Sequence, residues 1–85
     1  MSAIIKYSPD IERLKALLPE LSDRESQVSI LYFTGIPIKE ISDYLSISER
    51  TANCHICNSK NKFGLSTYQD LKTLILLRFL TAHHK

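Results

Sequence analysis

The chain has 85 residues, of which 44% are hydrophobic and 24% are charged, so it is long enough for one compact domain and too apolar for a disordered chain. Two glycines and three prolines leave little material for the turns of an all-β protein, and no apolar run approaches the roughly 18 residues of a membrane span. The formal net charge of +2 permits an anionic partner without requiring one.

The first predicted helix lies near the N-terminus. Ser8 is a typical N-cap, and Pro9 suits the first helical position. Apolar residues then recur at helical spacing until Pro19, which cannot continue the hydrogen-bond ladder. We therefore predict that residues 1–20 form an N-terminal extension with one short helix and that residues 21–85 form the main domain.

Two further helices follow in the first half of the chain. Ser22 and Glu25 are spaced as in a capping box, which predicts a helix start at this point, and Gly35 is placed to end that helix. A short helix is predicted over residues 38–45 from its regularly spaced apolar residues. The apolar positions of these two helices are Val28, Leu31, Tyr32, Ile38, Ile41 and Leu45.

The second half of the sequence predicts two longer helices. Residues 46–48 form a tight connection, Ser48 can cap a helix over about residues 49–63, and Gly64 ends it. A final, leucine-rich helix starts near residue 66 or 67 and runs to about residue 83. The predicted fold class is therefore all-α.

Two short helices joined by about three residues describe a helix-turn-helix. In the second of them, Ala52, Ile56, Ser59 and Phe63 form one inward stripe at helical spacing. The opposite face carries polar side chains and cysteines, with two lysines near its end, and in a major groove it would meet base edges and phosphates. These residues are Arg50, Asn53, Cys54, Cys57, Asn58, Lys60, Asn61 and Lys62.

A set of residues between positions 21 and 64 falls in the register of a known family pattern. It consists of Leu21, Ser22, Arg24, Glu25, Gly35, Lys39, Glu40, Ile41, Leu45, Ile47, Ser48, Thr51, His55, Asn58, Lys62 and Gly64. On these residues, the stretch from residue 21 to about residue 82 resembles the DNA-binding domain of the LuxR/GerE family of bacterial transcription regulators.

The resemblance implies a four-helix bundle whose third helix is the recognition helix and whose fourth commonly forms a homodimer contact. It would place Ser48, Thr51, Lys60 and Lys62 against phosphates, and His55 as a partly buried structural residue. Asn53, Cys54 and Cys57 would face the bases. With the residues of the exposed face, the predicted DNA-binding set is Ser48, Arg50, Thr51, Asn53, Cys54, Cys57, Asn58, Lys60 and Lys62.

The last helix carries apolar residues on more than one face, more than one small core needs. The predicted homodimer interface consists of Leu71, Leu74, Ile75 and Arg78. The N-terminus lacks the features of a secretory signal. We therefore expect a cytoplasmic, dimeric transcription regulator, nucleoid-associated when it binds double-stranded DNA, with no membrane contact.

Departures from the family pattern support an alternative function. The Arg often found shortly after the glycine is missing from Ser66 and Thr67, and three further positions differ. Ala52 stands where Val is usual, Asn53 where Lys or Glu is usual, and Ser59 where an apolar residue is usual. The base-facing surface thereby carries fewer long, positively charged side chains than is usual in the family. The alternative is a protein-interaction module, an anti-activator or co-regulator that pairs with another LuxR-type regulator and binds DNA weakly or not at all.

Two other kinds of site were weighed. Cys54 and Cys57 form a C-x-x-C pair, and His83 and His84 follow at the C-terminus, but zinc modules separate their ligand pairs with loops. We therefore predict no metal and no cofactor, and leave oxidation of the two thiols as an alternative. No nucleophile–base pair, paired-carboxylate site or glycine-rich phosphate loop is recognisable, so we predict no enzymatic activity.

Overall fold

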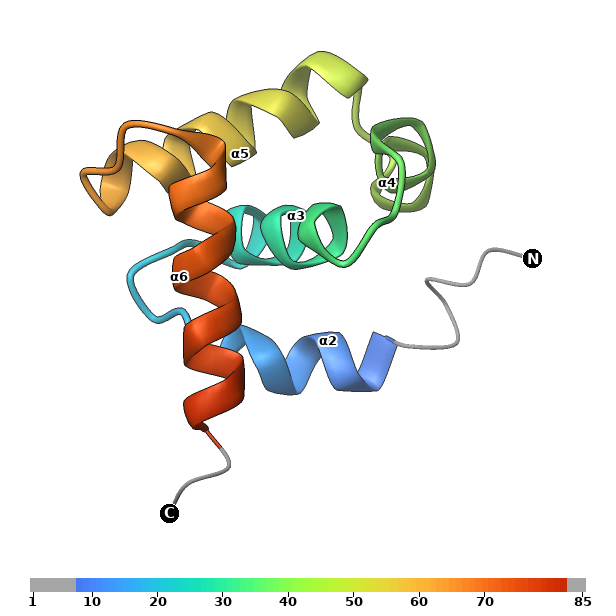
Figure 1. Ribbon diagram of the computed structural model, residues 1–85. Coiled ribbons are helices and arrows are strands. Elements are labelled where there is room, and N and C mark those ends of the chain that lie inside the picture. Colours follow the sequence, from blue (N-terminus) through green and yellow to red (C-terminus); the bar gives the residue numbers. More distant parts are fainter. Residues whose placement is uncertain (1–7, 83–85) are drawn as a thin grey trace.

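The computed structural model describes residues 8–82, which form five helices and no strand. The helices are α2 (Ser8–Lys15), α3 (Asp23–Phe33), α4 (Ile38–Leu45), α5 (Glu49–Lys62) and α6 (Tyr68–Thr81). Helix α3 lies between α2 on one side and α5 on the other, and α6 runs past the ends of these three helices (Figure 1). The predicted all-α fold class is confirmed.

One core joins all five helices. Its buried apolar residues include Ile11 of α2 and Leu18 of the following turn, so the described part of the predicted N-terminal extension packs against α3. The boundary predicted between residues 20 and 21 stays a prediction. Within the part of the chain that the structure describes, the buried apolar residues are Ile11, Leu18, Leu21, Val28, Ile30, Leu31, Ile41, Leu45, Ala52, Ile56, Leu71 and Ile75.

The end of α2 differs from the prediction, because the helix stops at Lys15 and not at Pro19. The backbone N–H groups of residues 16–18 donate to carbonyls three residues back, those of Arg13, Leu14 and Lys15. Such bonds form a tighter turn than the α-helix. This turn carries Leu18 into the core, where it is 1% exposed.

The predicted helix starts and stops at α3 and α5 are confirmed. Ser22 Oγ accepts the Glu25 N–H at 3.2 Å, and Glu25 Oε1 accepts the Ser22 N–H at 2.9 Å, which completes the capping box. Gly35 after α3 and Gly64 after α5 have φ values of +103° and +68°. A side chain at either position would be strained, which is why glycine ends these helices.

Arg78 of α6 forms hydrogen bonds to the turn after α2. Its Nη1 and Nη2 donate to the two carboxylate oxygens of Glu20 at 2.7 and 2.8 Å, and Nη1 also donates to the Leu17 carbonyl at 3.0 Å. The guanidinium lies 5.2 Å from the centre of the Phe63 ring. Arg78 therefore links α6, the end of α5 and the turn before α3.

The ion pair between Glu20 and Arg78 predicts a pH dependence of stability. The hydrogen bond from Arg78, followed by one from the Glu20 backbone, lowers the pKa of Glu20 from 4.5 to about 2. A lowered pKa in the folded state means that the stabilisation is complete above about pH 4.5 and is lost as the pH falls through about 2. We expect Glu20→Gln to be less stable than the wild type at neutral pH and to converge with it in acid. Urea unfolding of both proteins at several pH values measures this convergence. A difference in unfolding free energy that stays the same at every pH would contradict it.

Candidate nucleic-acid interface

Helices α4 and α5 form the predicted helix-turn-helix. Ser46, between them, has φ 57° and ψ 43°, the left-handed conformation that ends α4 sharply. Ser48 then caps α5, because its Oγ accepts the Thr51 N–H at 3.0 Å. The 14 residues of α5 span about 21 Å at 1.5 Å per residue. This rod lies along one side of the molecule (Figure 1).

The inner face of α5 packs on α3, as predicted. Ala52, Ile56 and Ser59 are at most 3% exposed, and Phe63 packs against the edge of the core. His55 is half-buried, as the resemblance implies. The core contact therefore fixes which side of α5 faces solvent.

The outer face of α5 carries the predicted DNA-binding residues. At 100° per residue, Arg50, Cys54 and Asn58 point away from the buried stripe, and all three are exposed. On the edge toward α6, Asn53 is exposed and Cys57 and Lys60 are half-buried. The opposite edge carries the exposed Thr51 and Lys62, and Ser48 is exposed at the start of the helix.

Two predicted phosphate contacts, Ser48 and Thr51, also hold the start of α5 together. Besides accepting the Thr51 N–H, the Ser48 hydroxyl donates to Thr51 Oγ1 at 2.9 Å. Both side chains remain exposed. Their contact with phosphate stays a prediction, but the cap arranges both hydroxyls beside the first-turn N–H groups, where an anion is favoured.

Lys62 has a partner that the sequence did not reveal. Its Nζ lies 2.6 Å from Oε1 of Glu25, whose side chain is 9% exposed, while the Lys62 side chain is 45% exposed. Burial acts to raise the pKa of Glu25, but the bonds from Lys62 and from the Ser22 N–H outweigh it, so the pKa lies below its usual range. The end of α5 is thus tied to the start of α3.

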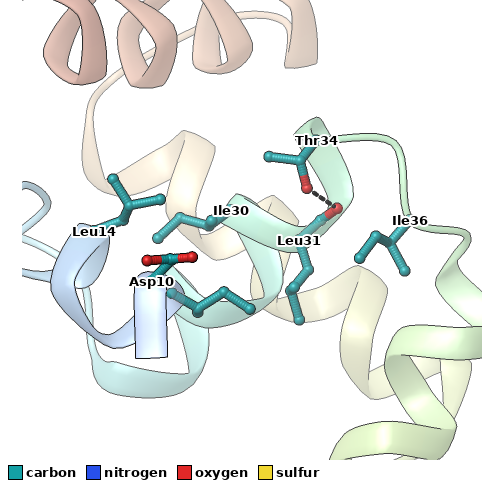
Figure 2. A pocket seen from close by; sticks show the side chains of 7 residues that line it. Asp10, Leu14, Ile30, Leu31, Thr34 and Ile36 are labelled. Atoms are coloured by element: carbon teal, nitrogen blue, oxygen red, sulfur yellow. Dashed lines mark hydrogen bonds between the residues drawn. The ribbon is translucent and has the colours of Figure 1, made fainter. Parts of the chain in front are cut away.

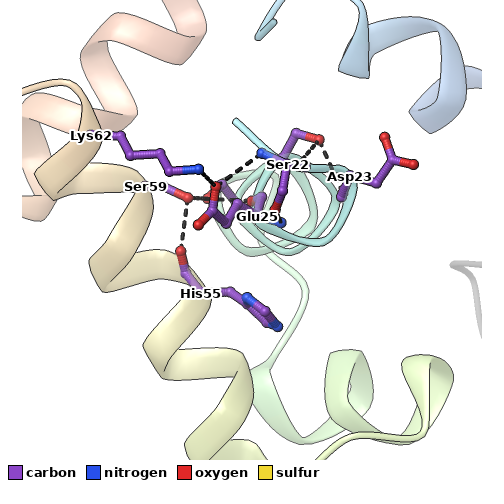
Figure 3. Close-up of polar contacts among 8 residues, drawn as sticks. Ser22, Asp23, Glu25, His55, Ser59 and Lys62 are labelled. Atoms are coloured by element: carbon purple, nitrogen blue, oxygen red, sulfur yellow. Dashed lines mark hydrogen bonds and ion pairs between the residues drawn. The ribbon is translucent and has the colours of Figure 1, made fainter. Parts of the chain in front are cut away.

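Ser59 also joins α5 to α3, and Figure 3 shows it beside His55 and Glu25. Ser29 Oγ of α3 donates to Ser59 Oγ at 3.0 Å, and Ser59 Oγ donates to the His55 carbonyl at 2.8 Å. Both serines are fully buried. A satisfied polar pair therefore occupies the place where the resemblance leads us to expect an apolar contact, and the buried hydroxyls carry no desolvation penalty of an unpaired group.

Lys60 lies over the ring of Tyr68 at the start of α6, with Nζ 5.8 Å from the ring centre. Desolvation, followed by the nearby Cys57 thiol, raises the pKa of Tyr68. The phenol hydroxyl of a tyrosine can donate a hydrogen bond. Tyr68 is 48% exposed and joins the α6 edge of the interface, although the sequence analysis did not include it.

Replacing Lys62 is expected to destabilise the fold as well as to remove a charge. Lys62→Ala leaves the Glu25 carboxylate without its cation, at a cost of about 1–2 kcal/mol; the half-exposed lysine keeps this below the cost of breaking a fully buried pair. Lys60→Ala removes the same charge from the half-buried edge toward α6, where it loses only the contact with the Tyr68 ring, and should cost about 0.5 kcal/mol. Urea unfolding of both variants measures the difference. Equal stabilities would contradict a role for the Glu25–Lys62 pair.

A cavity of about 380 Å³ lies between α2 and α3, away from α5. Figure 2 shows Leu14, Ile30, Leu31 and Ile36 around it, with the Thr34 hydroxyl bonded back to the Leu31 carbonyl. The lining is mostly apolar, and its two polar side chains already have partners: Asp10 pairs with Arg13, and the Thr34 hydroxyl donates to the Leu31 carbonyl. Its lining residues are Asp10, Ile11, Leu14, Ile30, Leu31, Thr34 and Ile36.

Other kinds of site can be assessed only for residues 8–82. Within this range no group of three or more His, Cys, Asp or Glu side chains could hold a metal ion. His83 and His84, which completed the zinc alternative, lie outside the described residues. No helix in the described range has both the length and the apolar character to cross a membrane.

Comparisons with known proteins agree with the resemblance. The family described as bacterial regulatory proteins, luxR family, matches residues 19–75. The response regulator protein TmoT of Ectopseudomonas mendocina is 39% identical over 64 residues, which are 75% of this chain and 29% of that protein. The chain thus spans less than a third of this relative's length. No solved structure matches it.

Proposed function

Because the chain belongs to the luxR family of bacterial regulatory proteins, we propose that it binds double-stranded DNA as a transcription regulator, with α5 in the major groove. The observation that carries the proposal is the position of α5: its inner face is buried on α3, and its outer face offers Arg50, Cys54 and Asn58 to solvent. A major groove about 12 Å wide admits a helix presented in this way. Such a role places the protein in the cytoplasm, on the nucleoid while it is bound.

We assign proposed roles to individual residues of α5 from their side-chain chemistry and exposure. Asn53 and Asn58 have amides that can pair with base edges, adenine above all. Arg50 and Lys60 supply exposed or half-exposed cations for phosphates, and the first turn of α5 adds the Ser48–Thr51 cap. Lys62 shares its ammonium with Glu25, so its contribution to phosphate binding should be smaller than that of Arg50.

Homodimer formation through α6 is the finer part of the proposal, and the burial of its side chains guides the choice of residues. Leu71 and Ile75, predicted for the interface, are 0% and 1% exposed because they pack into the core of the same chain. They therefore have almost no surface to offer a second copy, and we look to other residues of α6 for the proposed contact. Leu74 is half-buried, and Arg78 already has partners in its own chain.

The apolar surface of α6 consists of Leu76, Leu77 and Leu80, which are 40%, 55% and 63% exposed. We assign the homodimer contact to these three residues. The same surface also supports the second candidate function, pairing with another regulator of the family, because large exposed apolar side chains on one helix mark a contact surface. The relative's name, response regulator, supports a regulatory role under either candidate.

A salt titration of DNA binding tests the first function. We expect the full chain to bind random duplex DNA in fluorescence anisotropy with a Kd of about 10⁻⁴–10⁻⁶ M, weakening steeply with salt. Arg50→Ala should reduce the log–log salt slope by about 1, since one phosphate contact is lost. Arg13→Ala is the matched control, because it removes the same charge from the exposed surface of α2, beyond α3 from α5 (Figure 1).

The outcomes separate the two candidates. Weaker binding in Arg50→Ala together with unchanged binding in Arg13→Ala supports DNA binding by α5. Equal losses in both variants would indicate attraction to net charge without an interface. No binding at low salt by the folded wild type would overturn the first function and favour the interaction module.

A further inference from the structure

Two free cysteines lie in the middle of α5, three residues apart. Cys54 is exposed and Cys57 is half-buried, so a solute meets the Cys54 thiol first and the Cys57 thiol lies one turn further along. We propose that these cysteines form a peroxide-sensitive pair, oxidised to an intrachain disulfide that distorts α5. The proposed effect on DNA affinity rests on the proposed function, whereas the oxidation itself does not.

The surroundings of the pair suit a reactive thiol. Arg50 lies one turn before Cys54 and Lys60 lies almost one turn after Cys57, so cations flank the pair along the helix. Asn61 Nδ2 approaches the Cys57 sulfur at 3.8 Å. Reactive cysteines are generally accessible to solvent, as Cys54 is, whereas structural cysteines are buried.

The chemistry needs one molecule of hydrogen peroxide. The Cys54 thiolate attacks the peroxide O–O bond, forming an S–O bond and releasing hydroxide, which gives a sulfenic acid. The Cys57 sulfur then attacks the Cys54 sulfur, the S–O bond breaks, and the oxygen leaves as water when it takes up a proton. Two thiols and one peroxide thus yield one disulfide and two waters.

The geometry of an α-helix is unfavourable for a disulfide between Cys54 and Cys57. Forming this bond therefore changes the structure of α5. Residues three apart in an α-helix have Cβ atoms about 5–6 Å from each other, but a disulfide requires about 3.5–4.5 Å. The backbone between Cys54 and Cys57 must therefore deform to close the bond. This segment includes the centre of the outer face, so base and phosphate contacts on both sides of it are displaced.

The test uses the full chain, treated with hydrogen peroxide and then examined by mass spectrometry, circular dichroism and DNA anisotropy. We expect the loss of two hydrogen atoms, a monomeric band on a non-reducing gel, reduced helical signal and about tenfold weaker DNA binding, all reversed by dithiothreitol. Cys57→Ser should stop at a sulfenic acid that dimedone traps. Cys54→Ser, compared only with its own untreated form, should show no further change in helical signal or DNA affinity on the same treatment.

Each contrary result overturns the proposal. A disulfide between two chains, a pair that stays reduced in peroxide, or an intrachain disulfide with unchanged helical signal would do so. Failure of the reduced wild type to bind DNA would overturn the proposed function instead, because the mass and circular dichroism measurements decide the thiol chemistry without DNA.

Discussion

Leu71→Ala is expected to lower the free energy of unfolding by about 3 kcal/mol, because a buried leucine is removed and its space is only partly refilled. The Leu71 side chain is completely buried, on the side of α6 that faces the core. Urea unfolding followed by circular dichroism measures the change. A loss of this size is a large share of the about 5–15 kcal/mol by which a typical domain is stable.

Leu77→Ala is the matched control on the same helix, since it makes the same chemical change at a side chain that is 55% exposed. At low protein concentration we expect it to change stability by about 0.5 kcal/mol or less. If α6 forms the proposed homodimer, Leu77→Ala should weaken association in sedimentation experiments at higher concentration. Similar destabilisation of both variants at low concentration would show that the assignment of the buried face of α6 is wrong.

The sequence does not determine which apolar residues of α6 are buried and which are exposed. Leu71 and Ile75 are four residues apart on one face, and Leu76 and Leu80 are four residues apart on another. Both pairs have helical spacing, so periodicity alone cannot say which pair enters the core. The choice is made by the packing of α6 against α5 and by the anchorage of Arg78, which depend on residues distant in the chain.

Local signals, by contrast, predicted the boundaries of α3, α4 and α5 well. The capping box at Ser22 and Glu25 and the glycines at positions 35 and 64 act within one helical turn, so the sequence contains the whole interaction. The end of α2 was predicted less well. Pro19 excludes continuation of the helix but does not determine that the chain tightens three residues earlier.

The candidate site likewise has one part that the sequence predicts and one part that it does not. The outer face of α5 was predictable because it is the complement of one buried stripe, Ala52, Ile56 and Ser59. The contacts that hold α5 on α3 were not predictable, because Lys62 and Glu25, like Ser59 and Ser29, are separated by 30 residues or more. Pairing between such distant residues leaves no periodic signal in a single sequence.

Leu18→Ala is expected to destabilise the whole chain by about 2–4 kcal/mol, although residue 18 precedes the segment that matches the luxR family. Leu18 is 1% exposed and belongs to the same core as Val28 and Leu31 of α3. If the turn after α2 is part of one cooperative unit, the loss appears as a shift of the single unfolding transition. Leu17→Ala, at the half-buried neighbouring position, should cost about 1 kcal/mol, in proportion to its smaller burial.

A contrary result would have a definite meaning for the organisation of the chain. If Leu18→Ala left the unfolding midpoint unchanged, α2 and its turn would dock on α3 without contributing to the stability of the matched domain. The N-terminal extension would then be a separable element, as the predicted boundary at residue 20 implies. A full shift would instead show that the turn after α2 belongs to the cooperative unit that presents α5, since α3, which supports α5, is covered by α2 on its other side (Figure 1).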